Sequence, residues 1–205
     1  MRYFVALTDA VDLTTTVYHN SFERSWYKLN DLRNILLVGN LSLSAALAGA
    51  GGGAGLTCLK GESAYDLRVR NNNRSYYGQG VEQLADVRFD TGGADHEVSV
   101  GLRYHRDEED RFQNDDLYNQ TANGTITGFT PGAPGSQDNR VEAVKALAAF
   151  VQDRIRMGPW QFIPGVRFET LDYSRTNRAT GVSGDASLNM LGGGLGVIYD
   201  WNPPL

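Results

Sequence analysis

The fold is decided by the stretch His-Glu-Val-Ser-Val-Gly-Leu-Arg-Tyr-His-Arg-Asp at residues 96–107. Apolar side chains occupy one parity of this stretch, at Val98, Val100, Leu102 and Tyr104. Polar side chains occupy the other parity, including Glu97, Ser99, Arg103 and His105. Alternation with a period of two predicts a β-strand with one apolar face.

The same pattern predicts further strands on both sides of this one. Residues 81–90 alternate in the same way, and Thr91-Gly92-Gly93-Ala94-Asp95 predicts a tight hairpin between the two strands. We expect the other strands at 2–8, 12–22, 142–156, 161–169 and 187–201.

Two features complicate this interpretation of the strands. Residues 141–156 carry apolar side chains on both parities and could equally form an amphipathic helix, but their place before a tight turn at 157–159 and another strand favours a strand. Pro164 lies inside a predicted strand, where it removes a ladder hydrogen-bond donor.

The connections between the predicted strands alternate between short and long. Short turns fall at 9–11, 91–95 and 157–159, and longer loops fall at 23–77, 108–141 and 175–186. Long structureless loops are uncommon in soluble domains, whereas outer-membrane barrels have short periplasmic turns and long extracellular loops. Phe89, Trp160 and Trp201 lie near the short turns and Tyr104 and Tyr173 near the opposite strand ends, which predicts two aromatic belts. The expected fold is all-β, with about seven antiparallel up-and-down strands forming part of a transmembrane β-barrel.

Composition narrows the class of protein. The chain has 205 residues, a formal net charge of −5 and one cysteine, Cys58. It is one large domain or part of one, it has no broad basic charge for nucleic-acid binding, and it cannot form an internal disulfide. The mean hydropathy of −0.37 argues against a bundle of membrane helices, but a barrel strand buries only alternate residues in lipid.

Two segments bear on targeting and membrane insertion. The first residues show no signal-peptide pattern. Between Arg33 and Lys60 no side chain is charged, yet Asn40 and the glycines of 49–55 disfavour a spanning helix. We expect a partly helical or disordered loop there.

Five stretches in chain order resemble TonB-dependent outer-membrane receptors, of the branch similar to the ferric citrate receptor. They are residues 15–29, 72–81, 101–106, 150–169 and 195–199. The resemblance implies a plug inside a 22-stranded barrel in the bacterial outer membrane. Such a receptor imports a ferric siderophore, here a ferric dicitrate-like chelate, with energy from a TonB complex. It implies neither catalysis nor a cofactor.

The chain departs from that pattern in extent. Residues 1–205 show no plug and no TonB-contacting box, and they have room for about seven strands. We therefore expect a partial barrel whose TonB contact lies in the missing plug region and whose outer face meets lipid. Because an unclosed sheet leaves backbone groups that lipid cannot satisfy, such a piece is not expected to transport by itself.

Arginines are the candidate ligand-binding residues. Arg106 and Arg111 lie where the predicted strand at 96–107 passes into the loop at 108–141. Arg68, Arg70 and Arg74 lie near the end of the longest predicted loop, at 23–77. Guanidinium groups match carboxylates of an anionic iron chelate bidentately. Arg74 is the strongest candidate because it lies in a family-like stretch. The alternative is an ordinary solvated loop, in which neighbouring acids neutralise the arginines.

Other chemistry is weakly supported. His105 lies beside Asp107, Glu108 and Glu109, but the three histidines fall on separate predicted strands, so we expect no metal site. The glycines of 49–54 formally match a dinucleotide fingerprint, but no strand precedes them and residues 55–61 are not expected to open a helix. Cys58 is expected in a loop without a role.

Two rival functions remain open. The first is a secreted soluble β-sandwich that binds carbohydrate or another ligand through its loops, in which the valines of 98–100 would pack under a second sheet. The second is an enzyme that uses the surroundings of His105.

Overall fold

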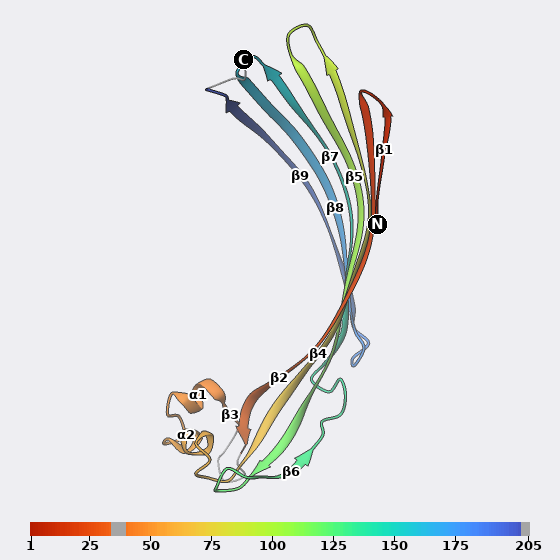
Figure 1. Cartoon of the computed structure of the whole chain (residues 1–205). Coiled ribbons are helices and arrows are strands. Elements are labelled where there is room, and N and C mark those ends of the chain that lie inside the picture. Colours follow the sequence, from red (N-terminus) through yellow and green to blue (C-terminus); the bar gives the residue numbers. More distant parts are fainter. Residues whose placement is uncertain (34–39, 202–205) are drawn as a thin grey trace.

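The computed structural model describes residues 1–33 and 40–201. Seven long strands form one antiparallel sheet in the order β1-β2-β4-β5-β7-β8-β9 (Figure 1). Their bounds are Arg2–Thr8 (β1), Val11–Arg33 (β2), Tyr65–Asp90 (β4), Asp95–Gln120 (β5), Asp138–Met157 (β7), Trp160–Asn177 (β8) and Ser183–Tyr199 (β9). Two short strands, β3 (Asn40–Ser42) and β6 (Ile126–Thr130), pair with β2 and β5. The all-β prediction is confirmed.

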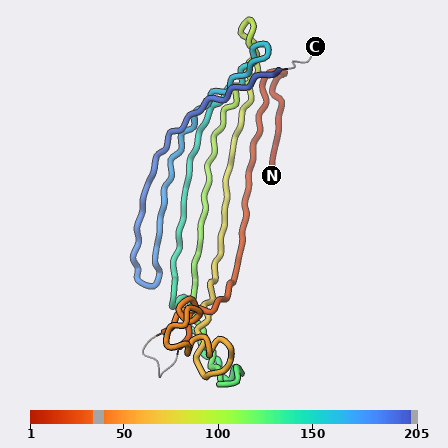
Figure 2. Tube along the Cα trace, turned by 90° about the vertical axis from the view of Figure 1, so that its left-hand side faces the viewer, coloured from red at the N-terminus to blue at the C-terminus, as the bar shows by residue number. Residues whose placement is uncertain are grey.

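The long strands run up and down beside their neighbours, as the trace in Figure 2 shows. At one end of the sheet they are joined by tight turns, two of which need glycine. Asp90 pairs with Asp95 around Gly92 and Gly93, whose φ angles are 78° and 130°. Gly158 has a φ of 57° between β7 and β8. Only glycine adopts such angles without a Cβ penalty, so these sequence positions fix the hairpins.

The strands are longer than predicted, and the loops correspondingly shorter. β2 continues to Arg33, β4 begins at Tyr65 and β5 continues to Gln120. The expected loops at 23–77 and 108–141 are therefore wrong in extent. Beyond the apolar part of the sheet both faces carry polar side chains, so the alternation vanishes while the backbone ladder continues.

Residues 141–156 form a strand, as predicted, within β7. Their apolar residues lie on both parities because some positions on the polar face are also buried. Ala146 and Ala148 are buried there, and the ring of Phe150 fills the space that a Cβ on Gly101 would occupy. Pro164 lies in β8 opposite Leu195 of β9. The pairing of β7 with β8 is interrupted between Gln152 and Ile155, opposite Pro164, where the missing N–H cannot bond.

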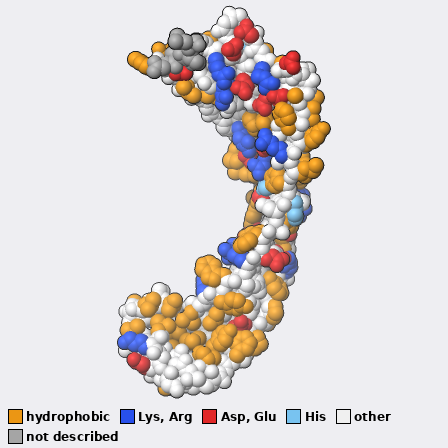
Figure 3. All heavy atoms as spheres, viewed as in Figure 1, with side chains coloured by type: hydrophobic (Ala, Val, Ile, Leu, Met, Phe, Trp, Pro, Cys, Tyr) orange, Lys and Arg blue, Asp and Glu red, His pale blue; other side chains and the backbone are white. Residues whose placement is uncertain are grey.

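The sheet is a single curved layer with two unlike faces (Figure 1). Val100 lies opposite Ala85 on one side and Val151 on the other, and Val151 lies opposite Val166. Val100 is 47% exposed and Leu102 is 53% exposed. No second sheet covers them in the part of the chain that the structure describes, and hydrophobic side chains lie on the surface in Figure 3. The β-sandwich alternative is therefore wrong.

The apolar face has nearly the height of the apolar band of a membrane barrel. On β8 it runs from Trp160 to Phe168, roughly nine residues. At about 3.3 Å per residue and a tilt of about 40° this gives roughly 20 Å, near the apolar band of about 25 Å in membrane barrels. The first charged row beyond the band is Arg106, Lys145 and Asp172.

The aromatic residues agree with one predicted belt but not fully with the other. Trp160 and Tyr199 pack at the short-turn end, with ring centroids 4.7 Å apart. Tyr104 lies on the apolar face beside Val81 and Leu147. Tyr173 lies on the opposite face, between Val144 of β7 and Ala186 of β9 in the register, so its assignment to a lipid-facing belt is wrong. The reason is that Tyr173 has the same parity along β8 as the polar residues Arg167 and Glu169, and this parity belongs to the polar face.

A small hydrophobic core lies at the other end of the sheet. Helices α1 (Leu43–Leu47) and α2 (Ala54–Leu59) bring Ala46 and Cys58 against Leu32 and Tyr65. Two expectations are thereby corrected. Cys58 is fully buried in α2 rather than in a loop, and burial raises the pKa of its thiol. A helix does come after the glycines of 49–54, but helix α1 precedes them, so the strand, turn and helix of a dinucleotide site are not assembled.

The predicted loop between Arg33 and Lys60 is partly helical as expected, and its residues 34–39 lie outside the described residues. Among the helices that the structure describes, none has the length and hydropathy to cross a membrane.

Candidate functional site: an arginine row on the polar face

Four arginines lie side by side across the polar face of the sheet. The strand register places Arg24 of β2 opposite Arg74 of β4, Arg74 opposite Arg111 of β5, and Arg111 opposite Arg140 of β7. Like charges directly opposite each other destabilise a sheet. The row therefore needs anionic partners, either from the protein or from a ligand.

Protein carboxylates neutralise the row only in part. Glu109 accepts hydrogen bonds from Arg74 and Arg111, each at 2.8 Å. Glu142 lies 3.2 Å from Arg140 and 3.6 Å from Arg175, and Asp138 lies 3.5 Å from Arg140. Counting Arg175 with the row, five arginines face three carboxylates, which leaves a net charge of +2.

Arg24 is the member of the row that has no carboxylate partner among the described residues. Its guanidinium carbon instead lies 5.6 Å from the ring centre of Tyr76 and 5.9 Å from that of Trp26. Its buried Nε has no hydrogen-bond partner within the same set of residues, and the same is true of the Nε of Arg74. Arg140 Nε also makes no hydrogen bond among these residues, although it lies 3.2 Å from Glu142, so the row holds three buried Nε donors without a hydrogen-bond acceptor.

The electrostatics favour the ionised forms of Glu109 and Arg111. Burial opposes ionisation of Glu109, but the hydrogen bond from Arg111 and the charges of Arg111 and Arg74 outweigh it, so its pKa is lowered. Burial works against the charge of Arg111, but the bond to Glu109 and nearby carboxylates raise its pKa. The arrangement therefore presents fixed positive charge to a ligand.

A hollow of about 440 Å³ adjoins the row on the same face. Phe22 and Tyr76 stack at one side of it, with centroids 6.0 Å apart, and Tyr173 lines it from β8. Its lining holds four carboxylates and no arginine, so the positive charge lies beside the hollow and not within it; the four are Asp107, Glu108, Glu109 and Glu142. The site thus combines aromatic rings with guanidinium groups, which are held at neighbouring positions of the same strands.

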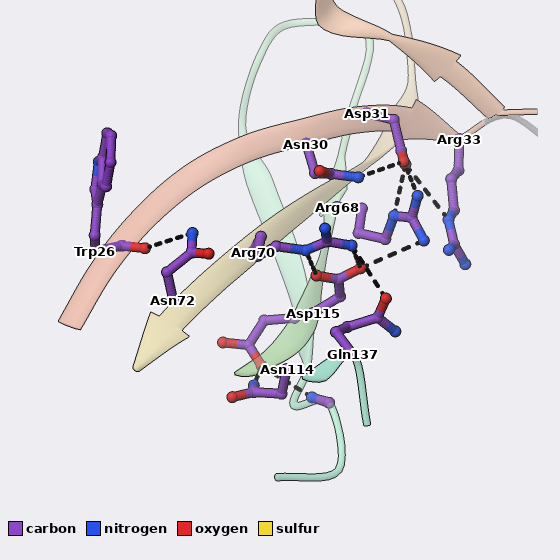
Figure 4. Close-up of polar contacts among 12 residues, drawn as sticks. Trp26, Asn30, Asp31, Arg33, Arg68, Arg70, Asn72, Asn114, Asp115 and Gln137 are labelled. Carbon is purple, nitrogen blue, oxygen red and sulfur yellow. Dashed lines mark hydrogen bonds and ion pairs between the residues drawn. The ribbon is translucent and has the colours of Figure 1, made fainter. Parts of the chain in front are cut away.

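A second ionic network ties the far ends of the strands together (Figure 4). Arg68 donates to both carboxylate oxygens of Asp31 and lies 3.4 Å from Asp115. Arg70 donates to Asp115 at 2.7 Å and 3.0 Å and to Gln137 at 3.0 Å. The bond to Asp115 raises the pKa of Arg70. Arg68 and Arg70 thus lie on one side, as their parity predicts, but each is already paired.

The predicted arginines therefore separate into three groups. Arg74 and Arg111 come together in the row, and Arg68 and Arg70 belong to the network beyond it. Arg106 lies on the opposite face, where it bonds Glu108 at 3.0 Å and stacks on Tyr77. The structure does not bring it together with Arg111, because the two residues have opposite parity on β5.

Sequence reasoning missed Arg24 and Arg140, because each is a single arginine in its own stretch and only the register aligns them. His105 bonds Tyr18 and Asp107, which lies two residues along β5. No group of three metal-ligating side chains occurs among the described residues.

A family model described as the TonB-dependent receptor-like β-barrel matches residues 4–205. The chain belongs to this family. Its members are receptors and transporters of the bacterial outer membrane rather than enzymes.

Three solved structures show the same fold. The unliganded ferric citrate transporter FecA is 22% identical with a TM-score of 0.67, and the match covers 98% of this chain and 24% of that one. BauA, the ferric preacinetobactin receptor from Acinetobacter baumannii, is 10% identical with a TM-score of 0.65, over 98% and 27%. The siderophore receptor PiuA from the same organism is 13% identical with a TM-score of 0.57, over 96% and 28%. The chain spans about a quarter of the length of these receptors.

Proposed function

We propose that this chain is part of the barrel wall of a TonB-dependent receptor that takes up an anionic ferric siderophore, such as a ferric dicitrate-like chelate, across the bacterial outer membrane. The arginine row contacts the chelate, and Arg74 and Arg111 are its central ligands. The TonB complex acts through a plug region that residues 1–205 do not show. The names of the neighbouring receptors, which include ferric citrate and siderophore receptors, support this substrate class.

The observation that carries the proposal is the row of opposed guanidinium groups with a net charge of +2. For two unit charges about 5.5 Å apart, the repulsion is about 3 kcal/mol at an effective dielectric constant of about 20. A chelate with several carboxylate oxygens relieves this repulsion and accepts bidentate hydrogen bonds. The site therefore favours a ligand with several negative oxygens over a neutral one.

The other face of the sheet supports the place of the protein in the membrane. Val100, Leu102 and Val166 are exposed in a band of bilayer height, and lipid tails would cover them. The polar row then lies just outside the hydrocarbon, beyond Arg106 and Lys145, where a chelate from the medium can reach it.

A binding measurement tests the proposal. The protein is purified in detergent micelles, and binding of ferric dicitrate is measured by equilibrium dialysis with labelled iron. The double substitution Arg74→Gln and Arg111→Gln removes two charges and is expected to weaken binding at least tenfold. Arg106→Gln removes a charge from the same strand on the opposite face and is the matched control, expected to change binding less than about twofold. Equal losses in both variants, or no binding by the unaltered protein, would refute the proposal.

A further inference from the structure

A second hollow, of about 510 Å³, lies at the level of the arginine row but on the opposite face of the sheet. Its lining on β2, β4 and β5 consists of the pairs of residues that flank the arginines of the row: Glu23 and Ser25, Asn73 and Ser75, and Asp110 and Phe112. These six residues have the same parity as Val17, Val81 and Tyr104 of the apolar band. The hollow therefore lies on the lipid-facing side of the sheet, beyond the band.

The hollow lies higher than a phospholipid headgroup reaches. Tyr104 belongs to the last apolar row before the charged row of Arg106, and Asp110 lies six residues beyond Tyr104 on β5. At about 3.3 Å per residue and a tilt of about 40°, six residues rise roughly 15 Å. Phospholipid headgroups extend only about 5–8 Å beyond the hydrocarbon on each side of a bilayer. A lipid that fills the hollow therefore needs a longer polar headgroup, such as an oligosaccharide.

The side chains of the hollow suit a sugar. The ring of Phe112 is 41% exposed and offers an apolar surface to the C–H face of a sugar ring. The side chains of Glu23, Asn73 and Ser75 make no hydrogen bond or ion pair among the described residues. Together they offer a carboxylate, an amide and a hydroxyl, which match the donors and acceptors of sugar hydroxyl groups.

The charges on this face favour an uncharged sugar over an anion. Arg178, in the connection between β8 and β9, donates to both carboxylate oxygens of Asp110, so this pair is neutral. Glu23 then leaves the face with one negative charge. Arg24 and Arg74 also line the hollow, but their parity is that of the other face, where Arg74 bonds Glu109. Opposite faces of the same strands thus favour different ligands.

We infer that this hollow binds the oligosaccharide headgroup of a glycolipid in the adjacent leaflet of the membrane. Phe112 packs against a sugar ring, and Glu23 and Asn73 accept hydrogen bonds from its hydroxyl groups. The inference goes beyond the proposed function and uses no property of the chelate. It depends only on the assignment of the apolar face to lipid.

Native mass spectrometry of the protein in lauryldimethylamine oxide, a detergent without sugar, tests the inference. The probes are three lipids with two acyl chains each: phosphatidylcholine, monogalactosyldiacylglycerol and digalactosyldiacylglycerol. We expect the apparent dissociation constant of the digalactosyl lipid to be at least about fivefold lower than those of the other two, because only its second sugar extends to the hollow. Equal binding of the three lipids would overturn the inference.

Substitutions locate the binding. Phe112→Ala and Glu23→Ala are each expected to raise the dissociation constant of the digalactosyl lipid about fivefold and to leave that of phosphatidylcholine within about twofold. Phe112→Tyr keeps the ring and is expected to keep the affinity. Phe129→Ala is the matched control, because Phe129 is 55% exposed on β6 outside the hollow. Equal losses in Phe112→Ala and Phe129→Ala would contradict the site.

The two ligand sites can fail separately. Phe112 and Arg111 are neighbours on β5 but lie on opposite faces, so Phe112→Ala is expected to change binding of ferric dicitrate less than about twofold. A protein that binds the digalactosyl lipid but no ferric chelate would support the inference and refute the proposed function. A protein that binds ferric dicitrate but does not prefer the digalactosyl lipid would do the reverse.

Discussion

Glu109 is the carboxylate that allows two arginines of the row to lie opposite each other, so its replacement by glutamine gives a sharp test of the site. Its side chain is 20% exposed and lies 2.8 Å from both Arg74 and Arg111. Arg74 and Arg111 donate to the same oxygen of Glu109, and glutamine keeps that acceptor but not the negative charge that strengthens both bonds. Hydrogen bonds to charged groups are worth about 1.5–3 kcal/mol each. We therefore expect Glu109→Gln to lower the free energy of unfolding by about 2 kcal/mol.

The pH dependence gives an independent check on this reasoning. The pKa of Glu109 is lowered in the folded state from an ordinary value of 4.5. The carboxylate therefore contributes stability that is fully present above about pH 4.5 and is lost as the pH falls through its lowered folded pKa. Urea unfolding in lipid vesicles, measured between pH 3 and pH 7, is expected to show this loss in the unaltered protein and a smaller loss in Glu109→Gln.

The same substitution is expected to strengthen binding of an anionic chelate, because it raises the net charge of the site from +2 to +3. Glu108→Gln is the matched control: Glu108 directly precedes Glu109 in β5, but it has the opposite parity and bonds Arg106. Unchanged stability, an unchanged pH profile and unchanged chelate affinity in Glu109→Gln would show that Glu109 does not hold the row together.

Three further outcomes are expected. Gly101→Leu should destabilise the sheet by about 2 kcal/mol in urea unfolding, because a Cβ there overlaps the ring of Phe150, whereas Gly194→Ala, with nothing within 4 Å, should have little effect. Val100→Lys, in the apolar band, should cost about 2–4 kcal/mol in lipid vesicles, and an unchanged stability there would contradict the assignment of that face to lipid. Cys58 should resist maleimide at pH 7 until the protein unfolds, because it is buried and its thiol pKa is raised; rapid labelling of the folded protein, detected by mass spectrometry, would show that the helical segment is not packed as described.

Much of the fold could be predicted from local pattern. The alternation at 96–107 predicted a strand with an apolar face, and Gly92 and Gly93 predicted the hairpin before it, because both signals depend on residues next to each other in the chain. The extents of β2, β4 and β5 could not be predicted, because polar residues fall on both parities of their outer parts and leave no periodic signal. The burial of Cys58 could not be predicted from the sequence either, because it depends on contacts of two short helices with Leu32 and Tyr65.

The amino-acid sequence by itself determined which side of the strand at 96–107 carries the apolar side chains, because side chains alternate with a period of two and need no partner to do so. It also supplied the family resemblance and singled out Arg74. Only the tertiary structure decided that Arg24, Arg74, Arg111 and Arg140 form one row, and that Arg106 lies away from it. Their alignment is set by the register of four strands whose arginines are up to 116 positions apart in the chain, and a register is a property of pairing between strands rather than of any one of them.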